Sequence, residues 1–263
     1  MTKRIEKVFS QLREKNQKAF VTFVMAGDPD LETTLELMKS FPNLGVDILE
    51  LGIPFTDPMA DGPSIQRAGI RSLKNGTNLQ EILKLVEKFR RFDTYTPVVL
   101  MGYFNPIYSY GVEKFLKDAK TFGVDGLIVV DLPPEEDIEL CIPSRNYEID
   151  FIRLSTPTSD KDRLAKILKN NSGFVYHVSI TGTTGAGRVD IKELEPEIKL
   201  VREFTQLPVC VGFGIKTPED AKNVSHIADG VVVGSAIIEK IEAGSSRKQT
   251  LEFVKSMANS VKS

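Results

Sequence analysis

The chain has 263 residues, of which 41% are hydrophobic, and 34 basic against 36 acidic side chains leave a formal net charge of -2. This balance gives no basic excess of the kind that binds nucleic acid or an anionic membrane, so we expect neither partner. The length suits either two ordinary domains or one (β/α)8 barrel, a single domain of about 250 residues.

The N-terminal segment "MTKRIEKVFSQLREKNQK" predicts a short amphipathic helix ahead of the rest of the fold. Apolar side chains share one face of this helix: Ile5, Val8, Phe9 and Leu12. A secretory signal peptide would instead need a continuous apolar core of about 7 or more residues. No later segment is apolar enough to span a membrane, and Cys141 and Cys210 lie far apart in apolar sequence, which favours reduced thiols. We therefore expect a cytoplasmic protein.

Eight short apolar runs, rich in β-branched residues, predict strands that alternate with helices. They are "AFVTFVMAG", "GVDILELG", "TPVVLMG", "VDGLIVVD", "IDFIRLS", "GFVYHVS", "LPVCVGFG" and "ADGVVVGS". Runs that are apolar on both faces are typical of a parallel sheet covered by crossover helices, whose starts are marked by caps at Asp30 and Thr217. The pattern predicts one α/β domain over residues 1–263, a (β/α)8 TIM barrel with an extra N-terminal helix. A doubly wound sheet in two lobes is the alternative, although no run has the polar pattern of an edge strand.

Glu50 lies inside the second run, where a core residue is expected. Side chains alternate along a strand, so Glu50 shares a face with Ile48, while Leu49 and Leu51 share the other face. The two leucines suit packing against helices, which would direct Glu50 into the barrel near the carboxyl end of the strand. A carboxyl group among apolar walls has a raised pKa and suits general acid/base catalysis. The alternative is a glutamate that pairs with a basic residue and only holds the barrel mouth together.

Two more carboxylates follow Glu50 in the loop "TDPMADGP". Asp61 is the second candidate for the chemistry, although "DGP" is also an ordinary turn sequence in which Asp binds backbone amides. Asp57 precedes Pro58 in a similar way, and we favour a turn or contact role for it. Asp131, at the end of the fourth run, is a secondary catalytic candidate.

Glycines follow the last three runs, in "TGTTGAG", "GFG" and "GS". Barrel phosphate sites are commonly built from the loops after strands 7 and 8 and a helix N-terminus, since backbone amides bind the anion there. Neither a GxGxxG fingerprint nor a Walker A loop is present, so dinucleotides and nucleoside triphosphates are not expected. The loop "ITGTTGAGRVD" at 180–190 has the composition of a lid. Sharp strand turns and simple disorder are the alternatives for these glycines.

Histidines are too few for a metal site, because only His177 and His226 occur and His177 lies on the strand face opposite Tyr176. The sequence has none of the usual signs of covalent catalysis. It contains no nucleophile elbow, no Ser/His/Asp set near the strand ends and no lysine after the sixth run. The remaining chemistry is proton transfer by carboxylates on a small phosphorylated substrate, without metal or cofactor.

Seven segments, in order, resemble the tryptophan synthase alpha chain family along nearly the whole sequence: "FVMAGDPD", "LELGIPFTDPMADGPSIQRA", "MGYFNPIYSYG", "GLIVVDLPPEE", "YHVSITGTTGAG", "VGFGIKTPEDA" and "VVVGSAI". The resemblance implies a lyase that cleaves indole-3-glycerol phosphate to indole and glyceraldehyde 3-phosphate. It implies that Glu50 protonates the indole ring carbon and helps deprotonate the glycerol hydroxyl. Asp61 would accept a hydrogen bond from the indole N–H as positive charge develops on that nitrogen.

The same resemblance implies which residues bind the indole ring of the substrate. They are Phe23, Ile65, Leu100, Leu127 and Tyr176. The alternation of Phe23 with Val21, and of Leu127 with Val129, agrees with side chains that face into the barrel.

The phosphate group would be held by Gly185, Gly214, Gly234 and Ser235. In the lid, the resemblance implies that Thr184 contacts Asp61 on closure, and it gives no role to Arg188.

The family works with a beta chain that carries pyridoxal phosphate and receives indole through a tunnel, so the resemblance implies an alpha2beta2 assembly and no cofactor in this chain. An aromatic cluster after the third run suits a contact surface: Tyr103, Phe104, Tyr108 and Tyr110. Local packing of that loop is the alternative. Asp57 and Pro58 lie in the loop that the family uses to meet its partner.

Two other functions remain open from the residues. One is a catalytically weak subunit that mainly activates a beta chain, although such a binder would need neither Glu50 nor Asp61. The other is an isomerase or epimerase of a sugar phosphate on the same barrel, which would not need an apolar indole pocket.

Overall fold

The computed structural model describes residues 4–179, 190–212 and 214–263. Within these ranges, parallel strands form one sheet: β1 (Ala19–Met25), β2 (Ile48–Gly52), β3 (Val98–Gly102), β4 (Gly126–Val129), β5 (Asp150–Phe151), β6 (Arg153–Ser155), β7 (Val175–Val178), β8 (Val209–Gly212) and β9 (Gly230–Val233). Every expected run contains a strand, and the fifth run contains both β5 and β6.

The sheet closes on itself into a barrel. Its strand order is β5-β4-β3-β2-β1-β9-β8-β7-β6, so the two ends of the order are the segments on either side of Ile152. The Ile152 N–H donates to the Leu127 carbonyl at 2.9 Å, which continues the hydrogen bonding between β4 and the fifth run. The nine labelled strands are therefore eight barrel strands, and the (β/α)8 prediction is confirmed, while the two-lobed alternative is wrong.

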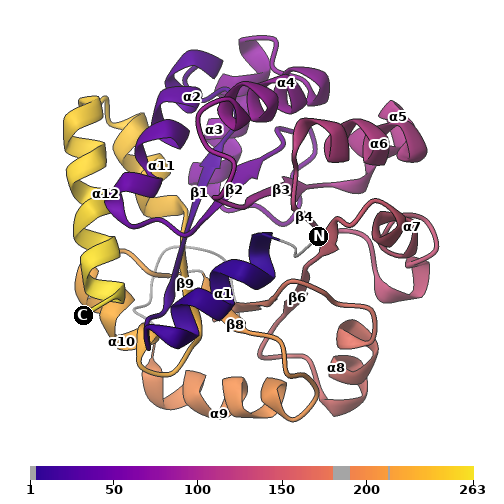
Figure 1. Ribbon diagram of the computed structural model, residues 1–263, viewed down its shortest axis with the longest axis vertical. Helices are drawn as coiled ribbons and strands as arrows, with labels where there is room; N and C mark the ends of the chain where they lie inside the picture. The colour runs from indigo at the N-terminus through magenta and orange to yellow at the C-terminus, as the bar shows by residue number, and fades with distance from the viewer. Residues whose placement is uncertain (1–3, 180–189, 213) are drawn as a thin grey trace.

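Helices surround the strands in an outer ring (Figure 1). They are α2 (Leu31–Ser40), α3 (Pro63–Lys74), α4 (Leu79–Arg90), α5 (Phe104–Tyr110), α6 (Val112–Phe122), α7 (Cys141–Asn146), α8 (Lys161–Leu168), α9 (Ile191–Arg202), α10 (Pro218–Ser225), α11 (Ser235–Glu242) and α12 (Arg247–Val261), with short 3-10 turns at Pro42–Leu44 and Pro134–Glu136. The predicted caps are present: Asp30 accepts the Thr33 N–H, and Thr217 forms a capping box with Asp220. None of the described helices has both the length and the apolar character needed to cross a bilayer.

The predicted N-terminal helix, α1 (Arg4–Glu14), lies across one end of the barrel (Figure 1). Its apolar face is buried: Ile5, Phe9 and Leu12 pack with side chains inside the barrel, among them Ile152 between β5 and β6 and Phe174 just before β7. The rings of Phe9 and Phe174 lie 5.9 Å apart. Helix α1 therefore closes the amino end of the barrel as a floor, which leaves the carboxyl ends of the strands as the open end.

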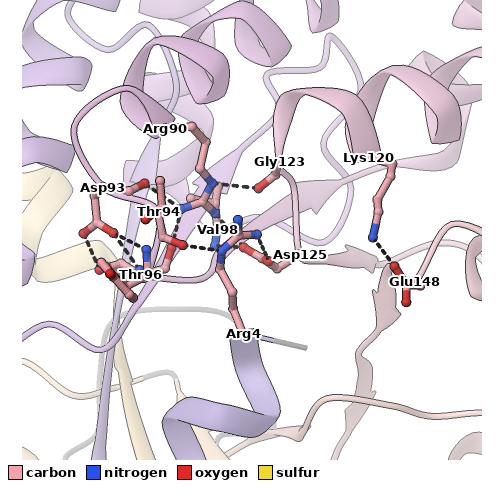
Figure 2. A network of polar contacts seen from close by, with 11 residues as sticks. Arg4, Arg90, Asp93, Thr94, Thr96, Val98, Lys120, Gly123, Asp125 and Glu148 are labelled. Atoms are coloured by element: carbon pink, nitrogen blue, oxygen red, sulfur yellow. Dashed lines mark hydrogen bonds and ion pairs between the residues drawn. The ribbon is translucent and has the colours of Figure 1, made fainter. Parts of the chain in front are cut away.

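A polar network fixes α1 to the amino end of the barrel (Figure 2). Arg4 binds Asp125 at 2.8 Å and the Thr94 carbonyl at 2.7 Å. Arg90 approaches the second oxygen of Asp125 at 2.6 Å, and that oxygen also accepts the Val98 N–H at 2.8 Å. One buried carboxylate thus joins α1, the end of α4 and the starts of β3 and β4.

Candidate active site

A cavity of about 1190 Å³ opens at the carboxyl ends of the strands, which is large enough for a small-molecule ligand. Its lower walls are apolar side chains that point into the barrel from five strand ends: Phe23, Met101, Val130, Leu154, Tyr176 and Val178. Polar groups and glycines gather around its rim. The predicted site residues that line it are Phe23, Glu50, Asp61, Ile65, Tyr176, Gly214, Gly234 and Ser235.

Glu50 lies at the bottom of this cavity and is 1% exposed. It faces the interior as predicted, since its partners across the sheet are Phe23 and Val99, both inward-facing. Among the described residues, neither carboxylate oxygen of Glu50 has a hydrogen-bond partner. Burial raises the pKa of Glu50 to about 8, because the charged form loses its hydration without gaining a cation. The alternative that Glu50 pairs with a basic residue is therefore wrong for the described part of the chain.

Glycines make room for two rings beside Glu50. A side chain at Gly52 would come within 2.6 Å of the Phe23 ring, and one at Gly212 within 2.1 Å of the Tyr176 hydroxyl oxygen. These glycines are needed for close packing of the pocket wall. Gly214, by contrast, has a φ of +72°, the left-handed conformation that a sharp turn requires.

Two predicted pocket residues do not line the cavity. Leu100 and Leu127 belong to the layer between strands and helices, together with Val129. Their neighbours along the strands face the interior instead, as Met101, Ile128 and Val130 show. The prediction for Leu100 and Leu127 is wrong, because alternation along a strand gives which residues share a face but not which face is inside.

Asp61 lies in the loop between β2 and α3, half-buried at the cavity rim. The Tyr103 hydroxyl donates to Asp61 at 3.0 Å and accepts the Ala60 N–H at 3.0 Å. Burial raises the pKa of Asp61, and the hydrogen bond from Tyr103 partly offsets this. Tyr103 is itself 1% exposed, so it is not the surface aromatic that the sequence suggested.

The opposite rim of the cavity has the character of an anion site. Gly234 and Ser235 stand at the N-terminus of α11, where unpaired backbone amides and the helix dipole favour negative charge. Gly214 and Lys216 line the same side, and Lys216 is a cation that the sequence reasoning did not consider. Thr184, Gly185 and Arg188 lie outside the described residues.

The other polar candidates have structural partners. Asp131 accepts the Phe104 N–H at 2.7 Å and so fixes the start of α5. Asp57 is exposed and accepts the Thr56 hydroxyl within its turn. His177 is buried on the outer face of β7 between Ser155 and Glu197. Across the described ranges, no group of three or more His, Cys, Asp or Glu side chains could hold a metal ion.

Comparison with known proteins identifies the family of this chain. A sequence model of the tryptophan synthase alpha chain family matches residues 9–263. The chain belongs to this family. Its reaction is a carbon–carbon lyase step, the cleavage of indole-3-glycerol phosphate in tryptophan biosynthesis.

Solved structures agree with the family assignment. Tryptophan synthase subunit alpha from Legionella pneumophila is 38% identical, with 99% of each chain covered and a TM-score of 0.91. A chain from Aquifex aeolicus is 38% identical over 100% of both chains, with a TM-score of 0.92. Tryptophan synthase from M. tuberculosis in its aminoacrylate-bound form is 30% identical, covers 99% of this chain and 100% of that chain, and has a TM-score of 0.90.

Proposed function

We propose that Glu50 and Asp61 carry out the family's reaction in this cavity, on indole-3-glycerol phosphate and without a metal or cofactor bound to this chain. The single observation that carries the proposal is a buried Glu50 without a hydrogen-bond partner among the described residues, inside apolar walls that match the indole ring. The phosphate of the substrate occupies the rim at Gly214, Gly234 and Ser235.

The proposed steps balance without a co-reactant. Glu50, protonated at neutral pH because burial raises its pKa to about 8, transfers its proton to the indole carbon that bears the glycerol chain. Asp61 accepts a hydrogen bond from the indole N–H and stabilises the positive charge that this protonation creates. The Glu50 carboxylate then takes the proton of the adjacent glycerol hydroxyl, and the carbon–carbon bond breaks to give indole and glyceraldehyde 3-phosphate.

The experiment is a turnover assay on the isolated chain with and without a beta chain. The sequence contains no Trp, so indole release can be followed by fluorescence with little protein background. Glu50→Gln keeps the size of the side chain but cannot donate the proton, so we expect turnover to fall by about 10² to 10⁴. A folded Glu50→Gln chain with wild-type turnover would remove Glu50 from the mechanism, and turnover only with a beta chain would indicate a subunit that needs activation.

We also propose that indole passes to a beta chain in an alpha2beta2 assembly, with pyridoxal phosphate held by that partner. Three large apolar side chains support a docking face at the cavity end of the barrel, since they are 65 to 78% exposed on successive loops and helices: Met59, Tyr108 and Ile138. Of the four predicted aromatics, only Tyr108 is strongly exposed. Buried thiols at Cys141 and Cys210, neither in a disulfide, support a cytoplasmic location.

A further inference from the structure

Four charged side chains connect the loop after β1 with α3 and α11, and one of them, Arg67, also lines the cavity. Arg71 on α3 grips Asp28 with two hydrogen bonds, of 2.7 and 2.9 Å, and reaches Glu242 at 2.8 Å. Arg67, one turn earlier on α3, grips both oxygens of Glu242 at 2.6 and 2.8 Å. We call the contacts of Arg67 and Arg71 with Glu242 the clasp.

The clasp is well ordered by its geometry. Paired hydrogen bonds from a guanidinium to a carboxylate fix both groups in one plane, unlike the single contact of a lysine. The Asp28 side chain is 0% exposed, so Arg71 is anchored in the interior, and Glu242 at 27% exposure is partly covered. Hydrogen bonding by Arg67 lowers the pKa of Glu242 to about 2, so the clasp stays charged at any pH used for an assay.

Each clasped helix begins at the active-site cavity. Helix α3 starts at Pro63, two residues after Asp61, and Gln66 in its first turns donates to the Asp61 carbonyl at 2.9 Å. Helix α11 starts at Ser235 on the anion side, and Glu242 is its last residue. A shift at one end of a rigid helix moves its other end as well. The clasp, at the far end of α11, therefore affects the distance between the two halves of the site, which are Asp61 before α3 and the anion site at the start of α11.

The apolar contact between α3 and α11 is made by few side chains. Ala68 on α3 and Ile238 on α11 are both 0% exposed and share a small cluster with Phe23 and Met25. Helices α3 and α11 are in contact with each other. Apolar contacts between these small clusters are not directional, whereas the forked Arg67–Glu242 pair and the single Arg71–Glu242 bond favour one register of the two helices.

We propose that the clasp sets the separation between Asp61 and the anion site, so that the cavity selects ligands in which an indole ring and a phosphate are joined by a three-carbon chain. Arg67, Arg71 and Glu242 are positioning residues in this proposal, which rests on the proposed function of the site. A clasp that only stabilised the fold would affect every ligand alike. If the clasp sets this distance, its loss lowers the affinity for a ligand that spans both halves and does not change the affinity for a ligand that binds only one half.

The experiment measures binding of one spanning ligand, indole-3-propanol phosphate, and of its two halves, indole and glycerol 3-phosphate. The variant is Glu242→Gln, which removes the charge at the centre of the clasp, keeps the side-chain size and leaves the buried Arg71–Asp28 pair in place. Glu242 does not line the cavity and is not expected to touch the ligand, whereas its partner Arg67 does line the cavity, so a gain in glycerol 3-phosphate affinity would show Arg67 acting on the phosphate directly and would overturn the proposal. We expect affinity for the spanning ligand to fall about tenfold and affinity for each half to stay within about twofold, because misalignment removes the advantage of linking the halves.

Arg202→Met is the control. It breaks the 3.0 Å ion pair between Arg202 and Asp229, which lies at the floor of the barrel, and the Arg202 side chain is exposed to an extent similar to that of Arg67. It should leave all three affinities unchanged. Equal losses for the spanning ligand and the halves in Glu242→Gln would overturn the proposal in favour of a purely structural role, and so would no loss at all. A second variant, Glu242→Asp, shortens the side chain but keeps the charge and should give an intermediate loss for the spanning ligand only. If the wild-type chain failed to bind the spanning ligand more tightly than glycerol 3-phosphate, the proposed function itself would be wrong.

Discussion

Glu50 combines two properties that oppose each other. Its burial makes it useful as an acid near neutral pH, and the same burial makes its ionised form costly for the folded protein. The sequence predicted this residue because a single glutamate in an apolar run is easy to see, and because Leu49 and Leu51 indicated which face of β2 meets the helices. The magnitude of the effect depends on the complete wall around it, which only the structure supplies.

Glu50→Gln should therefore make the protein more stable at alkaline pH. The folded state holds the Glu50 proton up to about pH 8, whereas an unfolded glutamate loses it near 4.5, so wild-type stability falls as pH rises between these values. The glutamine variant lacks this loss, and its advantage should grow from about zero below pH 4.5 to about 2 to 5 kcal/mol above pH 8. Urea unfolding of both chains at pH 5, 7 and 9 measures the difference, and a pH-independent difference would contradict the assignment of the raised pKa.

Tyr103 is a site residue whose role sequence reasoning missed. Its position in "GYFNPIYSYG" resembled a surface aromatic, and a hydroxyl that reaches a carboxylate 42 residues earlier leaves no local pattern. The hydrogen bond holds the Asp61 side chain at the rim and satisfies the Ala60 N–H as well.

Tyr103→Phe should weaken catalysis with little effect on folding. Loss of one hydrogen bond to a carboxylate costs about 1.5 to 3 kcal/mol. Because Asp61 acts in the proposed transition state, we expect kcat/KM to fall about 10-fold or more. Steady-state turnover of both chains measures this. Asp61→Asn serves as the reference, because Tyr103→Phe should add little in the Asp61→Asn background, and additive losses would show that Tyr103 acts independently of Asp61.

At the scale of elements, the strands were predictable and their inward faces were not. Apolar runs with helical patterns between them gave all eight barrel strands, and Asp30 and Thr217 gave two helix starts. In β3 and β4 every side chain is apolar or glycine, so the pattern contains no polar residue to mark the inside, and Leu100 and Leu127 were assigned to the wrong face. In β2 the charge of Glu50 gave that mark.

The floor network makes a prediction for one element contact. Asp125 is 8% exposed and faces the guanidinium groups of Arg4 and Arg90, and burial lowers the pKa of Arg90 to about 10. Asp125→Ala leaves Arg90 largely buried without a carboxylate, which should cost about 3 to 5 kcal/mol of unfolding free energy. Arg4→Met removes only a partly exposed partner and should cost about 1 kcal/mol or less. Chemical denaturation tests both, and equal effects would contradict a network centred on the Asp125–Arg90 pair.

The whole molecule has two unlike ends. The cavity end carries exposed Met59, Tyr108 and Ile138, whereas the floor end is closed by α1 and exposes Phe92 and Tyr95. Helices α1 and α12 both contact the same barrel, and that residues 1–263 form one domain stays a prediction. The Arg67–Glu242 pair, 175 residues apart in sequence, shows why long-range charge pairing escapes sequence reasoning.

Partner binding should depend on the cavity end only. Ile138→Asp places a charge on a side chain that is 69% exposed and outside the cavity lining, and it should weaken beta-chain binding about tenfold or more. Phe92→Asp changes a similarly exposed side chain, 66%, that follows α4 at the floor end, and it should have no effect. Calorimetry of each variant with a beta chain measures both affinities. A loss of affinity in Phe92→Asp alone would mean that the partner binds the floor end and would contradict the proposed docking face.

The helical floor has a consequence for how the protein is made. The apolar face of α1 is synthesised long before its partners, because Phe9 packs against Phe174 and the same inner cluster includes Val232. At about 5 to 20 residues per second, roughly ten seconds or more separate the emergence of α1 from that of its last partners on the ribosome. During that time the apolar stripe of α1 has no barrel to cover it, so in the nascent chain this helix exposes a surface that chaperones can bind.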